Sequence, residues 1–201
     1  DDDDQMSALK EILKKLNIDD KFLPPREIKS KISDAKNKLL GPQDWFAQSE
    51  RDYRSQLIYD VYNAYEEKLK SSNSLDFDDL IVKTLELFAQ HPPVLEAYQR
   101  KIRYIHVDEY QDTNYAQYML VRLLAAQSRN LCVVGDDDQS IYARTFATFS
   151  ILKRIFQMQG LSSWSRTTAR RLTFWMRRTR SSRLMPTERI RRFGRSRGRE
   201  N

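Results

Sequence analysis

The sequence predicts an α/β protein in which an all-helical N-terminal part precedes a parallel sheet with flanking helices. Two short apolar runs of strand-forming residues, 104–107 and 131–134, each end abruptly in acidic and polar residues. A segment of helical periodicity separates them, so we expect two parallel strands joined by a helix. In the first seventy residues, apolar side chains recur at helical spacing and no strand pattern is visible.

Three apolar stripes predict the helices of the N-terminal part. The stripes contain Met6, Leu9, Ile12, Leu13 and Leu16; then Ile28, Ile32, Ala35 and Leu39; then Tyr53, Leu57, Val61, Ala64 and Tyr65. Residues 17–25 separate the first stripe from the second, and Gly41-Pro42 ends the second. We expect the third helix to run from about residue 50 to residue 69, with the named side chains buried. The lysines of this part, Lys36 and Lys38 among them, are expected to be solvated or to touch duplex phosphates.

The second part begins after the polar linker 71–74. Asp76 is a candidate N-cap for a helix that ends at His91-Pro92-Pro93. A shorter helix, 94–101, leads into the first strand, where we expect His106 to be packed and hydrogen-bonded. Thr113 or Asn114 would cap the helix that leads to the second strand.

Bulk composition sets limits on the class of protein. The chain has 201 residues, enough for one or two domains with a core, and it begins with Asp, so we expect a fragment or a processed product. No apolar run approaches the length of a membrane span, and no signal peptide is visible. The single cysteine, Cys132, lies in a predicted strand and is expected to be a buried apolar residue. One cysteine fits a reducing cytosol, so we expect a cytoplasmic location.

The net charge of +7 is unevenly distributed. Residues 143–201 carry 16 basic and 2 acidic residues, whereas residues 1–142 carry 19 basic and 26 acidic residues. The basic excess therefore lies in the tail, and the isoelectric point carries no functional information about the body of the chain.

The strand ends carry the residues that suit nucleotide chemistry. Asp108 and Glu109 follow the first strand, and Gly135 to Ser140, with Gln139 among them, follow the second. In open α/β sheets, ligands bind outside the carboxyl ends of the strands. Carboxylates next to a polar amide suit a nucleotide-bound Mg²⁺ ion, which is often held by one or two carboxylates and the phosphates.

These residues resemble motifs of a known family. The run Val107-Asp108-Glu109-Tyr110-Gln111-Asp112-Thr113-Asn114 resembles the Walker B element, motif II, of UvrD/PcrA/Rep-type superfamily 1 DNA helicases. The run Val133-Val134-Gly135-Asp136-Asp137-Asp138-Gln139-Ser140-Ile141-Tyr142 is similar to motif III, and Leu75-Asp76-Phe77-Asp78-Asp79-Leu80 resembles a further motif upstream. The three occur in the family's order and spacing, and the resemblance covers residues 6–142.

The resemblance implies a domain organisation and an activity. Residues 1–72 would be the helical insertion subdomain (1B-like), and residues 73–142 part of the RecA-like, P-loop NTPase motor domain (1A-like). The family couples ATP hydrolysis, with Mg²⁺, to 3′–5′ translocation on single-stranded DNA and to unwinding at duplex junctions. Such helicases act in DNA repair, replication restart or recombination, and the parent protein would have repair proteins among its candidate partners.

The resemblance also implies roles for individual residues. Asp108 would be associated with Mg²⁺, and Glu109 would orient or activate the attacking water. Gln139 would contact the γ-phosphate, with Gln111 and Asp112 as coupling residues. Tyr142 would stack on a base of single-stranded DNA.

Structural explanations compete with these roles. Asp108 and Glu109 could form a solvated acidic turn, Gln139 an ordinary turn residue, and Asp112 with Thr113 a cap. Tyr142 could simply pack, because the family's neighbouring tryptophan is absent. The acids Asp136, Asp137 and Asp138 could shape the turn, or hold two metal ions for nuclease chemistry.

After Tyr142 the resemblance ends. The family continues with a W-R-G-A stretch, whereas this chain has Ala143, Arg144 and Thr145 and then an Arg-rich tail, 143–201. One synonymous codon string for residues 144–170, read from the third base of the Arg144 codon, gives DIRNILNLEKDFPNARVIKLEQNYRS, in which QNYRS resembles motif IV. We therefore expect a frameshifted, poorly ordered tail.

The phosphate-binding loop of an ATPase is absent from this sequence. None of the five glycines belongs to a G-x-x-x-x-G-K-[ST] motif, and the arginines of the later helicase motifs are absent too. The isolated chain is therefore expected to be inactive. The alternative function is a non-catalytic DNA- or protein-binding fragment with a basic tail.

Overall fold

The computed structural model describes residues 2–136, 161–164 and 171–175. The chain divides into two compact units, one containing the described residues up to Glu86 (the N-terminal unit) and one containing the described residues from Leu87 onward (the second unit). The division falls inside helix α5, Phe77–Gln90, whereas the expected domain boundary lies at residues 72/73. The assignment of an insertion and a motor domain therefore remains a prediction.

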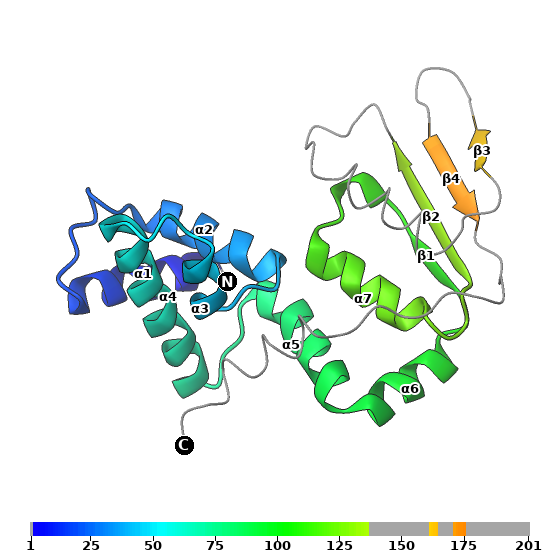
Figure 1. Ribbon diagram of the computed structural model, residues 1–201, viewed down its shortest axis with the longest axis horizontal. Coiled ribbons are helices and arrows are strands. Elements are labelled where there is room, and N and C mark those ends of the chain that lie inside the picture. Colours follow the sequence, from blue (N-terminus) through cyan, green and yellow to red (C-terminus); the bar gives the residue numbers. More distant parts are fainter. Residues whose placement is uncertain (1, 137–160, 165–170, 176–201) are drawn as a thin grey trace. The chain divides into compact units, whose positions relative to one another are not determined.

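Four helices build the core of the N-terminal unit: α1 Asp2–Lys15, α2 Pro25–Asn37, α3 Pro42–Ala47 and α4 Tyr53–Ser71. Figure 1 shows them gathered into one helical bundle. Their shared core contains Leu9, Ile12, Leu13, Leu23, Ile28, Ile32, Ala35, Leu40, Ile58, Val61, Tyr62 and Tyr65. The all-helical character expected for this part of the chain is confirmed.

Local signals explain where these helices begin. Pro25 and Pro42 occupy first-turn positions. Backbone N–H groups have no acceptor within the helix there, so the N–H that proline lacks is not missed. Asp52 caps α4 by accepting a hydrogen bond from the Ser55 backbone N–H at 2.8 Å. Because α4 starts at Tyr53 rather than near residue 50, the Tyr53 side chain lies in the first turn, and it is 73% exposed. The prediction that Tyr53 is buried was wrong.

The second unit combines helices with a small sheet. Helices α6 Pro92–Lys101 and α7 Tyr115–Ala125 contact each other, and the strands are β1 Ile105–Val107, β2 Leu131–Asp136, β3 Leu161–Trp164 and β4 Arg171–Trp175. The strand order is β1-β2-β4-β3, as Figure 1 shows.

The expected parallel pair is present. β1 and β2 are parallel and adjacent, with Ile105 opposite Leu131 and Val107 opposite Val133. β4 joins β2 in antiparallel orientation, and β3 pairs antiparallel with β4. β3 and β4 come from the Arg-rich tail, and the remaining residues of the tail lie outside the described part. The fold of the described chain is α/β and mostly helical.

His106 differs from its expectation. Its side chain, in the middle of β1, is exposed and lies on the opposite face of the sheet from the half-buried Ile105 and Val107. The expectation of a packed histidine was therefore wrong. Cys132, on the adjacent strand, is buried and free of any disulfide, and burial raises the pKa of its thiol, as expected for a structural cysteine.

Candidate functional site

Asp108 and Glu109 lie at the carboxyl end of β1, next to the corresponding end of β2. The parallel register places Val107 beside Val133, so both strands run out at the same edge of the sheet. Both acidic side chains are exposed. Carboxylates at this edge can reach a ligand bound outside the sheet.

The backbone at Glu109 adopts a left-handed conformation, with φ 49° and ψ 41°. A residue other than glycine is uncommon there, and the conformation costs about 1–2 kcal/mol. The Asp108 carboxylate offsets part of this cost by accepting a hydrogen bond from the Glu109 backbone N–H at 2.9 Å. Strained backbone of this kind recurs at binding and catalytic sites.

A short 3-10 turn, η1 Tyr110–Asp112, follows and folds the chain back on itself. The Asp112 backbone N–H donates to the Glu109 carbonyl at 2.9 Å, and the Thr113 N–H donates to the Tyr110 carbonyl at 3.1 Å. The turn brings the side chains of Glu109 and Gln111 together, and the Gln111 amide Nε2 donates to Glu109 Oε2 at 2.6 Å. Gln111 is 7% exposed, so its amide is held inside the protein while the Glu109 carboxylate faces outward.

Gly135, at the end of β2, lies directly against this turn. A Cβ atom on Gly135 would come within 2.9 Å of Gln111 Oε1 and 3.6 Å of Tyr110 Cβ. Real Cβ contacts essentially never reach the first of these distances. The polar turn after β1 therefore packs against the carboxyl-terminal part of β2 at Gly135.

Asn114 caps the helix that follows the turn. Its side chain accepts from the Gln117 backbone N–H at 2.9 Å, and the Gln117 side chain accepts from the Asn114 N–H at 3.0 Å. This reciprocal capping box decides between the two expected caps in favour of Asn114. Asp112 is exposed and Thr113 half-buried, and neither side chain caps α7.

The rest of the expected site falls outside the described residues. Gln139 and Tyr142 lie there, as do Asp137 and Asp138, and Asp136 is described by its backbone alone. Their predicted roles stay predictions, and so does the alternative of a two-metal acidic cluster.

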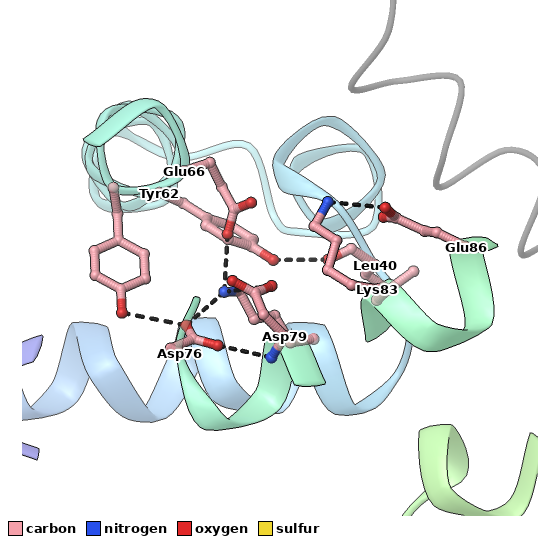
Figure 2. A network of polar contacts seen from close by, with 9 residues as sticks. Leu40, Tyr62, Glu66, Asp76, Asp79, Lys83 and Glu86 are labelled. Atoms are coloured by element: carbon pink, nitrogen blue, oxygen red, sulfur yellow. Dashed lines mark hydrogen bonds and ion pairs between the residues drawn. The ribbon is translucent and has the colours of Figure 1, made fainter. Parts of the chain in front are cut away.

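A second polar cluster surrounds Lys36 in the N-terminal unit. Lys36, on α2, is fully buried, and its Nζ lies 2.5 Å from Asp76 Oδ2, 3.0 Å from Asp79 Oδ1 and 3.0 Å from Glu66 Oε1. Figure 2 shows the carboxylates of Glu66 on α4, Asp76 just before α5 and Asp79 in the first turn of α5 converging. The expectation that Lys36 faces solvent or phosphate was wrong, because three carboxylates take it into the core.

Asp76 accepts three hydrogen bonds in this cluster. Its Oδ1 accepts from the Asp79 backbone N–H at 2.8 Å, which confirms the expected N-cap of α5. Its Oδ2 accepts from Lys36 and from the Tyr65 hydroxyl at 3.2 Å. Burial lowers the pKa of Lys36, but Glu66, Asp79 and Asp76 outweigh that effect and hold it above its ordinary value. Asp76, from the upstream motif 75–80, thus joins the start of α5 to the buried Lys36. The sequence gives no sign of this connection.

Magnesium fits the residues at the strand end. Asp108 is an exposed carboxylate beside Glu109, and Mg²⁺ is commonly bound by one or two carboxylates together with substrate phosphates. Across residues 2–136 and the two later strands, no three histidine, cysteine or acidic side chains gather closely enough to hold a metal unaided.

Within the described ranges, no helix combines the length and the apolar character needed to cross a membrane.

Comparison with known proteins identifies close relatives. The family model for the UvrD/REP helicase N-terminal domain matches residues 1–157. The chain is 57% identical over 139 residues to the ATP-dependent DNA helicase PcrA of Bacillus subtilis (strain 168), and 56% identical over 140 residues to that of Staphylococcus aureus (strain Mu50). Each match covers 69% of this chain and 19% of the relative, so the matched segment spans about a fifth of those proteins.

Proposed function

Because the chain belongs to the UvrD/REP helicase family, we propose that it is the central segment of the first motor domain of an ATP-dependent DNA helicase. In this proposal, residues 73–142 form part of a RecA-like domain and residues 1–72 form its helical insertion. The complete motor would move 3′ to 5′ on single-stranded DNA and unwind duplexes, in DNA repair or replication. Partners of the complete motor would be DNA and proteins of those pathways.

The observation that carries the proposal is the parallel pairing of β1 with β2. This pairing brings the acidic end of the first strand and the glycine end of the second to one edge of the sheet. In that position Asp108 can take the Mg²⁺–ATP complex and Glu109 can face the water that attacks the γ-phosphate. Gln139 would contact the γ-phosphate, and Tyr142 would stack on a DNA base.

The chain's own residues would supply positioning and proton handling. Asp108 would fix the metal–nucleotide complex at the strand end, and Mg²⁺ bound there would neutralise charge on the phosphates during transfer. The Glu109 carboxylate, oriented by Gln111, would accept a hydrogen bond from the attacking water and take up its proton.

A segment exchange tests this function. In the segment-exchange helicase, residues 6–142 of this chain replace the matching segment of Bacillus subtilis PcrA, and DNA-stimulated ATP hydrolysis and unwinding of a 3′-tailed duplex are measured. We expect both activities to be retained. A Glu109→Gln control should bind ATP and DNA but lose hydrolysis by about 10²–10⁴-fold, the usual contribution of a general base.

The outcomes separate the two candidate functions. If the exchanged helicase folds and binds DNA but hydrolyses no ATP, the segment is a binding module and the motor assignment fails. Retained hydrolysis that Glu109→Gln leaves unchanged would refute the role proposed for Glu109.

A further inference from the structure

Gln111 connects the end of β1 to the end of β2 through a single buried amide. Its Nε2 holds the Glu109 carboxylate, and its Oε1 faces the space above Gly135. We propose that Gln111 is a positioning residue for Glu109, and that Gly135 is required because it leaves room for the Gln111 amide. This inference rests on the proposed function, since it assigns Glu109 its orienting partner.

A hydrogen bond joins the side chains of Gln111 and Glu109. A donor to a carboxylate makes a charge-assisted bond, shorter and stronger than a bond between neutral groups, and here the separation is 2.6 Å. The Glu109 side chain is exposed, whereas Gln111 is 7% exposed. The buried amide therefore helps to fix the orientation of the exposed carboxylate.

The backbone turn brings the two side chains together. Glu109 is left-handed at φ 49°, and the hydrogen bond from the Asp112 N–H to the Glu109 carbonyl closes the turn. In an extended strand, the side chains of residues 109 and 111 would lie on the same face but would be separated along the strand. The turn replaces that arrangement with a direct contact between the two side chains.

Gly135 lies against the same amide. A Cβ there would approach Gln111 Oε1 to 2.9 Å and the Gln111 backbone nitrogen to 3.5 Å. Oε1 and the donor Nε2 belong to one rigid amide, so an atom that displaces Oε1 also displaces the donor from Glu109. A methyl group at position 135 should therefore weaken the same contact as a change at Gln111.

The kinetic test uses the segment-exchange helicase. Gln111→Met keeps the length of the side chain and removes the donor, and we expect kcat for ATP hydrolysis to fall about tenfold to a hundredfold, with KM for ATP unchanged within about twofold. Gln127→Met, at an exposed glutamine of the same unit, is the matched control and should leave both constants unchanged. Loss of fold would alter ATP and DNA binding as well, so binding of a non-hydrolysable ATP analogue is measured for each variant.

Gly135→Ala is the second, independent variant. We expect it to lower kcat in the same range as Gln111→Met, because the added methyl moves the amide. In the Gln111→Ala/Gly135→Ala double variant the clash is gone, so its kcat should match that of Gln111→Ala alone rather than fall by the product of the two effects.

The outcomes are distinguishable from failure of the proposed function. An unmodified segment-exchange helicase without ATPase activity refutes the proposed function. An active one in which Gln111→Met retains its kcat, or in which the two substitutions act independently, overturns the positioning role alone.

Discussion

Lys36 shows how one residue can decide the arrangement of several elements. The lysine is fully buried and shared by three carboxylates: Glu66 from α4, Asp76 from the position just before α5, and Asp79 from the first turn of α5. Burying a charge costs several kcal/mol unless opposite charges and hydrogen bonds compensate for it. The cluster therefore depends on all of its members, and loss of the cation would leave the acids uncompensated.

Lys36→Met should destabilise the N-terminal unit strongly. The substitution keeps a long side chain but leaves Asp76 and Asp79 buried without their cation, which typically costs about 3–5 kcal/mol. The loss of stability is measured as faster hydrogen exchange of peptides from α2 and α4, by mass spectrometry on the 201-residue chain. Lys38→Met, at an exposed lysine two residues away, is the control. Similar losses for the two variants would contradict the role assigned to the buried cluster.

The same cluster should make the N-terminal unit sensitive to alkali. The pKa of Lys36 in the folded chain lies above its ordinary value of 10.5, so its contribution is complete below that pH and is lost as the pH rises through the folded-state pKa. Burial, with Asp76, Asp79 and Glu66 nearby, also raises the pKa of the Tyr65 phenol, and this acts in the same direction. We expect protection of α2 and α4 amides, corrected for intrinsic exchange, to fall as the pH rises above 10.5. In Lys36→Met the fall should be smaller, and an equal fall would show that other groups cause it.

At the residue scale, the sequence predicts the location of a side chain well where that location depends on its position along a strand. Asp108 and Glu109 were placed correctly at a strand end, because an apolar run that stops in acids has few other arrangements. Lys36 was misjudged, although it lies four residues after Ile32 and eight after Ile28, on the buried face of α2. The charge of Lys36 favours exposure, whereas its helical spacing favours burial. The acids that compensate for the buried charge lie 30 to 43 residues away, so no local pattern reveals them.

At the element scale, α7 depends on its capping box. Asn114 and Gln117 satisfy each other's backbone N–H groups at the first turn. Since α7 follows the turn that carries Glu109 and Gln111, its first turn also anchors that loop. The box is a local pattern, and sequence alone narrowed the cap to Thr113 or Asn114.

Asn114→Ala should destabilise the start of α7 by about 1 kcal/mol, the usual cost of a lost N-cap. Hydrogen exchange of the first α7 peptide should accelerate about fivefold, and Gln127→Ala, at an exposed position after the helix, should change nothing. Unchanged exchange in Asn114→Ala would mean that packing of Ala116 and Met119 holds the helix without the cap.

Elements with strong periodicity were predicted well, and the details set by tertiary contacts were not. The stripes of α1 and α2 and the stop at His91-Pro92 correspond to the observed helices. The left-handed backbone of Glu109 has no local signal, because glutamate rarely adopts it. The exposure of His106 depends on which face of β1 it occupies, opposite to Ile105 and Val107.

At the scale of the whole molecule, the proposed function assigns the chain only part of the apparatus that ATP hydrolysis requires. A motor of this class needs a phosphate-binding loop, a metal site and a cationic clamp together. The 201 residues contain the acids proposed for the metal site but no G-x-x-x-x-G-K-[ST] sequence. Composition alone would have suggested a basic nucleic-acid-binding protein, whereas the basic excess lies after residue 142.

We therefore expect the purified 201-residue chain to release no phosphate from ATP above the uncatalysed background, with Mg²⁺ and single-stranded DNA present. The segment-exchange helicase, assayed in parallel, serves as the positive control. Robust turnover by the isolated chain would show that its residues assemble a phosphate site in another way.

The burial of Lys36 also makes its chemical reactivity a measure of whether the helices around it are folded. Amine-reactive reagents acylate lysines that water can reach, so Lys38 should be labelled in the native chain while Lys36 stays unmodified. The acylated fraction at Lys36 would then measure how often the helices around it come apart, in any preparation from a test tube to a cell extract.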